Sequence, residues 1–142
     1  MSKQEMERTT GVRLLFVASV VTTGILYLLV VPRLYFASEL DRVVIFVMVG
    51  WIPYTLLFYC LGRLGTTPTG MPKMRPADVG VALFVVAFLV SLGFDRWGVT
   101  PERVPEAHVI QLLAILVGLG LFGWGIGRRG AAIEELVSDT DT

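Results

Sequence analysis

The sequence has one cysteine, Cys60, and one histidine, His108, among its 142 residues. A single cysteine excludes an intramolecular disulfide and a Cys-x-x-Cys redox pair. A single histidine excludes haem held between two histidines of this chain, and also the His-Glu-x-x-His zinc motif of metalloproteases. The sequence therefore predicts neither a bound metal nor a cofactor.

Charged side chains are absent from four stretches of 16 to 20 residues each. A helix rises about 1.5 Å per residue, so about 20 residues cross the roughly 30 Å hydrocarbon core of a bilayer. With their flanking turns, these stretches predict membrane-spanning helices at about 14–32, 39–62, 77–97 and 107–127.

The composition agrees with a membrane protein, because 54% of the residues are hydrophobic and only 17% are charged. A soluble chain of this length would have too little polar sequence left to cover four apolar helices. We predict an all-α polytopic membrane protein, one domain over 1–142, folded as an antiparallel four-helix transmembrane bundle. The tail 128–142 is expected to form one helical turn over 131–137 and then to be disordered.

Basic residues are distributed unevenly between the two sides of this predicted bundle. Eight of the twelve lie before the first span, between the second and third, or after the fourth, and four lie in the other two loops. The positive-inside rule then places both termini in the cytoplasm of a multi-pass protein of the cell membrane. The formal net charge is zero, so no basic surface indicates nucleic-acid binding.

His108 and Gln111 are the polar pair expected at the outer end of the fourth span. Their i, i+3 spacing places both on one helix face. A metal or proton site with nearby loop carboxylates is one interpretation. An interfacial histidine among solvated charges is the other, and we favour it.

The second span carries a proline near its centre, which frees one backbone carbonyl and predicts a bend. Threonines of the first span are expected at the same depth. One hypothesis is a midplane pocket for a small apolar or lipid-like ligand. The alternative is a kink satisfied by packing alone. The residues of the pocket would be Thr22, Thr23, Trp51, Pro53 and Tyr54.

Small residues form two strips on nearly opposite faces of the fourth span, and such strips let helices approach closely. One strip holds Gly120, Gly123 and Gly127, and the other holds Ala114, Gly118 and Gly125. Two interpretations remain open. Both strips pack inside the chain, or one of them meets a second subunit.

The second and fourth spans end alike, at Gly62-Arg63 and at Gly127-Arg128. Glycine near a helix end is common, so the likeness has an ordinary explanation. A duplicated helical hairpin is the alternative interpretation.

No Asp, Glu, Lys or Arg lies inside the apolar stretches 14–32, 43–62, 79–94 and 109–127, and no nucleophile-and-base arrangement is recognisable, so an enzyme is not expected. The leading hypothesis is a non-enzymatic accessory or interaction subunit that acts through helix packing. Its partners would be the lipid bilayer and another membrane protein or a homo-oligomer. The alternatives are a small oligomeric transporter or channel, or a membrane protein that binds lipid or a small molecule.

Overall fold

The computed structural model describes residues 3–65, 70–94 and 96–140, and all their regular structure is helical. Four helices are long and apolar enough to cross a membrane, and the first of them is the continuous helix Lys3–Phe36. The prediction of a helical chain with four such spans is therefore confirmed. The elements are α1 (Lys3–Gly24), the π-helix η1 (Ile25–Val30), α2 (Val31–Phe36), α3 (Leu40–Leu64), α4 (Arg75–Phe94) and α5 (Pro105–Thr140).

The sequence explains where α4 and α5 begin. Pro76 lies in the first turn of α4, and Pro105 is the first residue of α5. Proline is tolerated there because the first N–H groups of a helix have no partner within the helix. Asp78 and Glu106 add negative charge to the same turns, where the helix dipole favours it.

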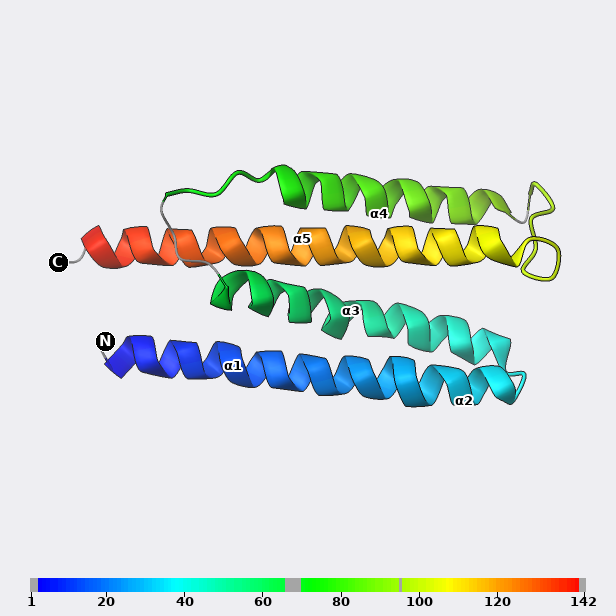
Figure 1. Cartoon of the computed structure of the whole chain (residues 1–142), viewed down its shortest axis with the longest axis horizontal. Helices are drawn as coiled ribbons and strands as arrows, with labels where there is room; N and C mark the ends of the chain where they lie inside the picture. Colours follow the sequence, from blue (N-terminus) through cyan, green and yellow to red (C-terminus); the bar gives the residue numbers. More distant parts are fainter. Residues whose placement is uncertain (1–2, 66–69, 95, 141–142) are drawn as a thin grey trace.

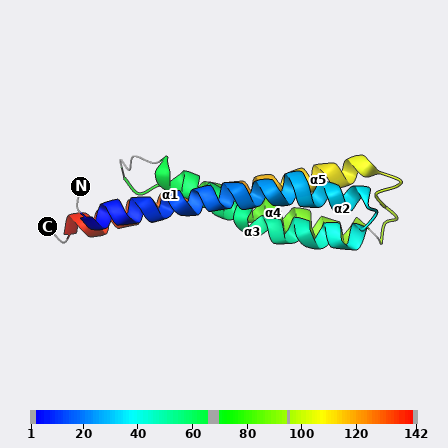
Figure 2. The ribbon, with the colours of Figure 1, turned by 90° about the horizontal axis from the view of Figure 1, so that it is seen from below.

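The four long helices form an open row in the order α1, α3, α5, α4 (Figures 1 and 2). Long helices that follow each other in the sequence (α1, α3, α4, α5) run in opposite directions. The row neighbours α3 and α5 therefore run parallel to each other (Figure 1). Among the described residues, the backbones of α3 and α4 do not approach each other, because α5 lies between them. The start of α1 and the end of α5 lie at the same end of the four helices, which we call the termini end; the opposite end is the loop end (Figure 1).

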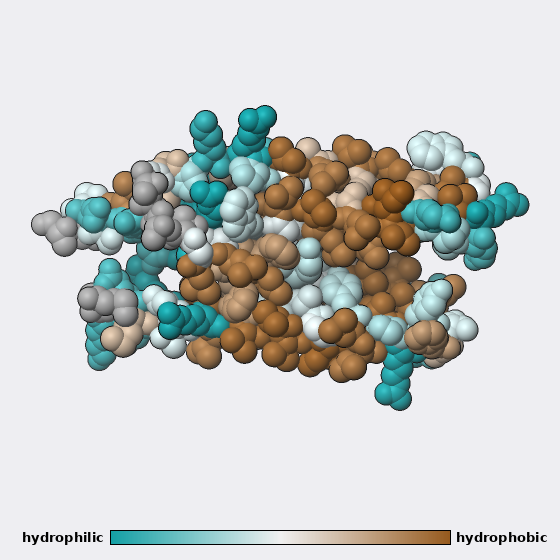
Figure 3. Space-filling view, in the orientation of Figure 1, coloured by the Kyte–Doolittle hydropathy of each residue, from teal (hydrophilic) through white to brown (hydrophobic). Residues whose placement is uncertain are grey.

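Apolar side chains cover the middle of the molecule, and polar ones gather at both ends (Figure 3). Many large side chains in this band are exposed, for example Leu28 and Leu92 at 75% and 63%. The buried apolar residues are mostly small, as Ala77 and Ala87 illustrate. Large residues outside and small ones between helices are typical of helices packed in lipid.

The π-helix η1 was not predicted from the sequence. The N–H of Val31 donates to the carbonyl of Leu26, five residues earlier. Pro32 follows at once, and in a regular α-helix its ring would clash with the carbonyl four residues before it. The wider turn of η1 lies where that clash would arise, so the helix continues through the proline without ending.

Two boundaries differ from the sequence-based expectation. The third span ends at Phe94 rather than near residue 97, because Trp97 already lies in a turn. The last helix continues to Thr140, where disorder was expected from Ser138 onward. The hydroxyls of Ser138 and Thr140 bond to backbone carbonyls one turn earlier, which satisfies groups at the helix end.

Candidate functional sites

The first glycine strip of α5 faces α3. A Cβ atom on Gly123 would overlap the carbonyl oxygen of Thr55, and one on Gly127 would overlap that of Tyr59. A Cβ atom on Gly120 would lie 3.7 Å from the ring of Phe58. The two helices therefore touch through their backbones.

The second strip faces α4. A Cβ on Gly118 would lie 2.8 Å from the carbonyl oxygen of Gly80, and one on Gly125 would lie 2.8 Å from the backbone nitrogen of Ala77. All five glycines of the predicted packing interface are thus used within the chain. A partner would have to bind elsewhere.

The residues of the predicted midplane pocket have different surroundings. The ring of Trp51 makes edge contacts with Phe84 and Phe88 of α4, at centroid distances of 5.5 and 6.4 Å. Thr22, in contrast, is exposed on α1. The hydroxyl of Thr23 and the indole nitrogen of Trp51 are buried without a hydrogen-bond partner in the described part of the chain.

Pro53 and Tyr54 follow Trp51 on α3. The helix continues through Pro53, and one turn is reinforced where the Thr55 hydroxyl donates to the Trp51 carbonyl at 2.7 Å. Tyr54 packs against Phe58 at a centroid distance of 5.0 Å. Thr55 and Tyr54 thus have partners within α3 itself.

Tyr27 makes a contact between η1 and α3 that was not predicted from the sequence. It lies in η1, and its hydroxyl donates to the carbonyl of Val47 at 2.9 Å. Its ring lies over Gly50, where a Cβ would come within 2.7 Å of it. The glycine at the centre of α3 was the available signal, because a missing side chain there makes room for a ring.

At the loop end, the His108 side chain contacts the backbone of Val104 and the ring of Phe94. Its Nδ1 lies 3.2 Å from the carbonyl oxygen of Val104, and its ring packs edge-on against Phe94. Gln111 is half-buried one turn along α5. Within the described residues, no three His, Cys, Asp or Glu side chains lie close enough together to hold a metal ion.

Glu102, in the turn before α5, has a carboxyl whose pKa is shifted by its neighbours. Hydrogen bonds from its own backbone N–H and from the Thr100 side chain lower the pKa of its carboxyl below the ordinary value, and His108 adds a smaller lowering. The carboxyl is exposed, so these bonds order the turn before α5 and do not build a cavity.

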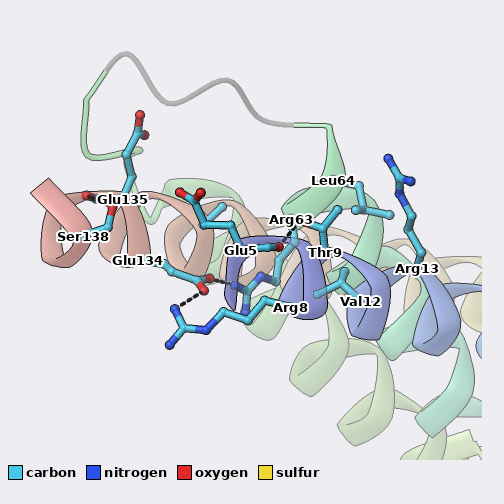
Figure 4. A pocket seen from close by; sticks show the side chains of 11 residues that line it. Glu5, Arg8, Thr9, Val12, Arg13, Arg63, Leu64, Glu134, Glu135 and Ser138 are labelled. Carbon is cyan, nitrogen blue, oxygen red and sulfur yellow. Dashed lines mark hydrogen bonds and ion pairs between the residues drawn. The ribbon is translucent and has the colours of Figure 1, made fainter. Parts of the chain in front are cut away.

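The termini end holds a cavity of about 690 Å³ between α1, α3 and α5, which we call the end cleft (Figure 4). Six of its residues are charged, three of each sign. The lining residues are Glu5, Arg8, Thr9, Val12, Arg13, Arg63, Leu64, Ala131, Glu134, Glu135 and Ser138.

Glu134 connects the three helices around this cleft. One of its oxygens accepts a hydrogen bond from Arg8 of α1 at 2.8 Å, and the other pairs with Arg63 of α3 (Figure 4). Arg63 also donates to the hydroxyl of Tyr59 at 3.1 Å. The Arg63 side chain is 22% exposed and that of Arg8 is 64% exposed, so the network reaches from the helix interface to open solvent.

The end cleft was not predicted from the sequence, because the tail was expected to form one helical turn and then to be disordered, with no contact to α1 or α3. Arginines and glutamates at this end of the helices were the available signal for ion pairs. The partners of Glu134 are 126 and 71 positions away in the sequence, however, so the pairing could not be read from local spacing. Comparisons with protein families, with curated proteins and with solved structures find no match. The interpretation therefore depends on the geometry of the chain itself.

Proposed function

We propose that this chain is a non-enzymatic interaction subunit of a membrane assembly, and that it binds its partner at the end cleft. The supporting observation is the cleft itself, a cavity of about 690 Å³ to which three helices contribute charged side chains. Ligand-binding cavities commonly measure about 300–1,000 Å³. The glycine strips of α5 do not support partner binding, because they already contact α3 and α4.

The chemistry of the cleft fits a membrane-adjacent segment of another protein that carries both signs of charge. Arg13 and Glu135 are exposed at opposite ends of the cleft, while Arg8 and Arg63 are held in position by Glu134 (Figure 4). Charges of both signs at fixed positions select a partner with a complementary pattern. Val12 and Leu64 provide apolar surface beside them.

Charge reversal at the cleft tests this proposal. The full chain, the Arg13→Glu variant and the matched Arg103→Glu variant at the loop end would be purified in native nanodiscs and their partners identified by mass spectrometry. We expect one stoichiometric membrane protein with the wild type and with Arg103→Glu, and its loss with Arg13→Glu. Retention by Arg13→Glu, or no stoichiometric protein in any sample, would overturn the proposal.

Lipid or small-molecule binding near the midplane is the second candidate. It is supported by the buried hydroxyl of Thr23 and the buried indole nitrogen of Trp51, which lack partners in the described residues. An unpaired polar group in an apolar environment costs free energy, and a bound molecule would remove that cost. A defined lipid or small molecule that co-purifies with the wild type and is lost from Trp51→Phe would favour this candidate.

A further inference from the structure

The order of the helices in the row has a two-fold pattern. The first hairpin, residues 3–64, contains α1 and α3, and the second, residues 75–140, contains α4 and α5. In each hairpin the second helix lies at the centre of the row and the first helix at its edge (Figure 1). A half-turn about an axis between α3 and α5, along the helices, would exchange α1 with α4 and α3 with α5.

The central helices also begin at equivalent positions. α3 starts at Leu40 and α5 at Pro105, and each has an acidic residue at its second position. The separation of 65 positions is kept at the other end, where Gly62-Arg63 corresponds to Gly127-Arg128. Identical residues at this separation are Val44 and Val109, Ile45 and Ile110, Leu56 and Leu121, Gly62 and Gly127, Arg63 and Arg128, and Gly65 and Gly130.

Two sets of contacts between α3 and α5 occur in pairs that obey the same separation. Gly62 lies against the carbonyl of Trp124, and its equivalent Gly127 lies against the carbonyl of Tyr59, the equivalent of Trp124. The helices cross at this reciprocal contact. A parallel pair that meets through reciprocal glycines is the arrangement by which identical membrane helices associate.

A second pair of contacts lies one turn further from the termini end. Gly123 meets Thr55, and Gly120, the equivalent of Thr55, meets Phe58, the equivalent of Gly123. The same residue positions therefore face each other from both sides of the axis. The register of α3 against α5 is therefore the one that aligns the equivalent residues of the two helices.

Side chains near the crossing repeat the pattern. Arg63 lies over the ring of Tyr59, at 5.9 Å from its centre, and Arg128 lies over the ring of Trp124, at 4.7 Å. Each arginine folds back on the aromatic residue four positions before it. The equivalent side chains of the two helices thus adopt the same local arrangement.

We infer that the chain contains two copies of one two-helix unit, and that α3 and α5 present a self-complementary surface whose partner is the other copy. Two-fold interfaces between identical units bring the same patch of each unit together. Here the two units are joined covalently, and the edge helices have diverged further than the central ones. Parallel repeats about an axis along the membrane normal are a known way to build membrane proteins.

An exchange of side chains across the axis tests this inference. Thr55→Gly with Phe58→Gly removes the ring that covers Gly120, and Gly120→Thr with Gly123→Phe places bulk against α3. Each half-exchange is expected to lower the Tm measured in detergent. The four substitutions together exchange the residues at equivalent positions of α3 and α5, so the same side chains meet again across the axis. We therefore expect most of the combined loss of Tm to be recovered.

A four-residue variant whose Tm loss equals the sum of the two halves, or which does not fold, would overturn the inference. A milder exchange provides a second measurement. Tyr59→Trp with Trp124→Tyr exchanges equivalent positions and should leave the Tm within about 2 °C of the wild type, which is below 1 kcal/mol. The control Tyr54→Trp with Trp124→Tyr has the same composition at non-equivalent positions and should lower it. Equal losses in the two exchanges would also count against the inference.

Discussion

Ser38 has a φ of 59°, and it is the only non-glycine residue in the described part of the chain with a positive φ. It lies in the short turn between α2 and α3, and the N-cap residue of α3, Glu39, makes no side-chain cap bond. Left-handed backbone costs an L-residue about 1–2 kcal/mol, because its Cβ approaches the next carbonyl. Glycine has no Cβ and adopts this conformation freely.

Replacing Ser38 with glycine is therefore expected to stabilise the turn. We expect Ser38→Gly to raise the Tm by about 2–4 °C, the shift that about 1 kcal/mol produces in a chain of this size. Ser38→Ala retains the Cβ and should give no increase. Thermal unfolding of both variants in the same detergent checks the prediction, and a lower Tm for the glycine variant would contradict it.

Two hydrogen bonds lower the pKa of the Glu102 carboxyl. The larger effect comes from the backbone N–H of Glu102 itself, and the next from the side chain of Thr100. A hydrogen bond to the ionised carboxylate favours that form, so its removal raises the pKa. Thr100→Val should therefore move the pKa of Glu102 upward, whereas Thr100→Ser keeps the hydroxyl and should not. Carbon-13 NMR titration of the carboxyl in micelles measures this, and an unchanged value in the valine variant would refute the assignment.

The sign of the pH effect follows from the direction of the shift. The pKa of Glu102 is lower in the folded chain than its ordinary value, so the bonds stabilise the turn above that ordinary value. This contribution is lost as the pH falls through the lowered pKa. Thr100→Val should therefore reduce the difference between neutral and acidic conditions.

At the scale of the elements, the four spans were predictable because charge is excluded from long segments, and that exclusion depends on local sequence alone. The end of α4 at Phe94 and the continuation of α5 to Thr140 were not, because hydrogen bonds and ion pairs decide them. The π-helix η1 was also missed. Pro32 gives the reason for a distortion there, but sequence does not say whether the helix bends, ends or widens.

Gly62 on α3 offers a test of how closely two elements pack. A Cβ at this position would overlap the carbonyl oxygen of Trp124, and α5 would have to move away. We expect Gly62→Ala to lower the Tm by several degrees, since both helices lose contacts along the crossing. Gly11→Ala is the matched control, because nothing lies within 4 Å of its Cβ. The control should keep or raise the Tm, as alanine favours a helix more than glycine does.

A loss of stability in Gly11→Ala as large as that in Gly62→Ala would contradict the packing argument. The comparison also separates two effects of glycine, its helix propensity and its lack of volume. Only the second depends on the neighbouring helix. Thermal unfolding in one detergent measures both variants under the same conditions.

At the scale of the whole molecule, the order α1, α3, α5, α4 was not predictable from the chain. All four spans are apolar on every side, so hydrophobic periodicity does not identify the face that meets a neighbour. The glycine strips of α5 indicated two close neighbours, but not which helices these were. The end cleft was missed for a related reason, since it requires that α1 and the extension of α5 lie together.

Glu134 holds these two helices together at the termini end, where their backbones do not approach each other within the described residues. Its carboxylate pairs with Arg8 and with Arg63, and Glu134→Gln removes the charge from both pairs. Each partly exposed pair is worth about 0–1 kcal/mol, so the global Tm should change little. The N-terminal turns of α1 should instead separate from α5.

Spin labels on α1 and α5 measure that separation. With labels at Thr10→Cys and Val137→Cys in a Cys60→Ala background, we expect Glu134→Gln to broaden the distance distribution and shift it to longer values. Glu135→Gln is the matched control, because the Glu135 carboxylate points away from Arg8 and Arg63 (Figure 4). High salt should broaden the distance distribution of the chain with Glu134 intact in the same way, since salt screens exposed charges. If Glu134→Gln leaves the distribution unchanged, packing rather than charge closes the end cleft, and a partner would meet a preformed cavity.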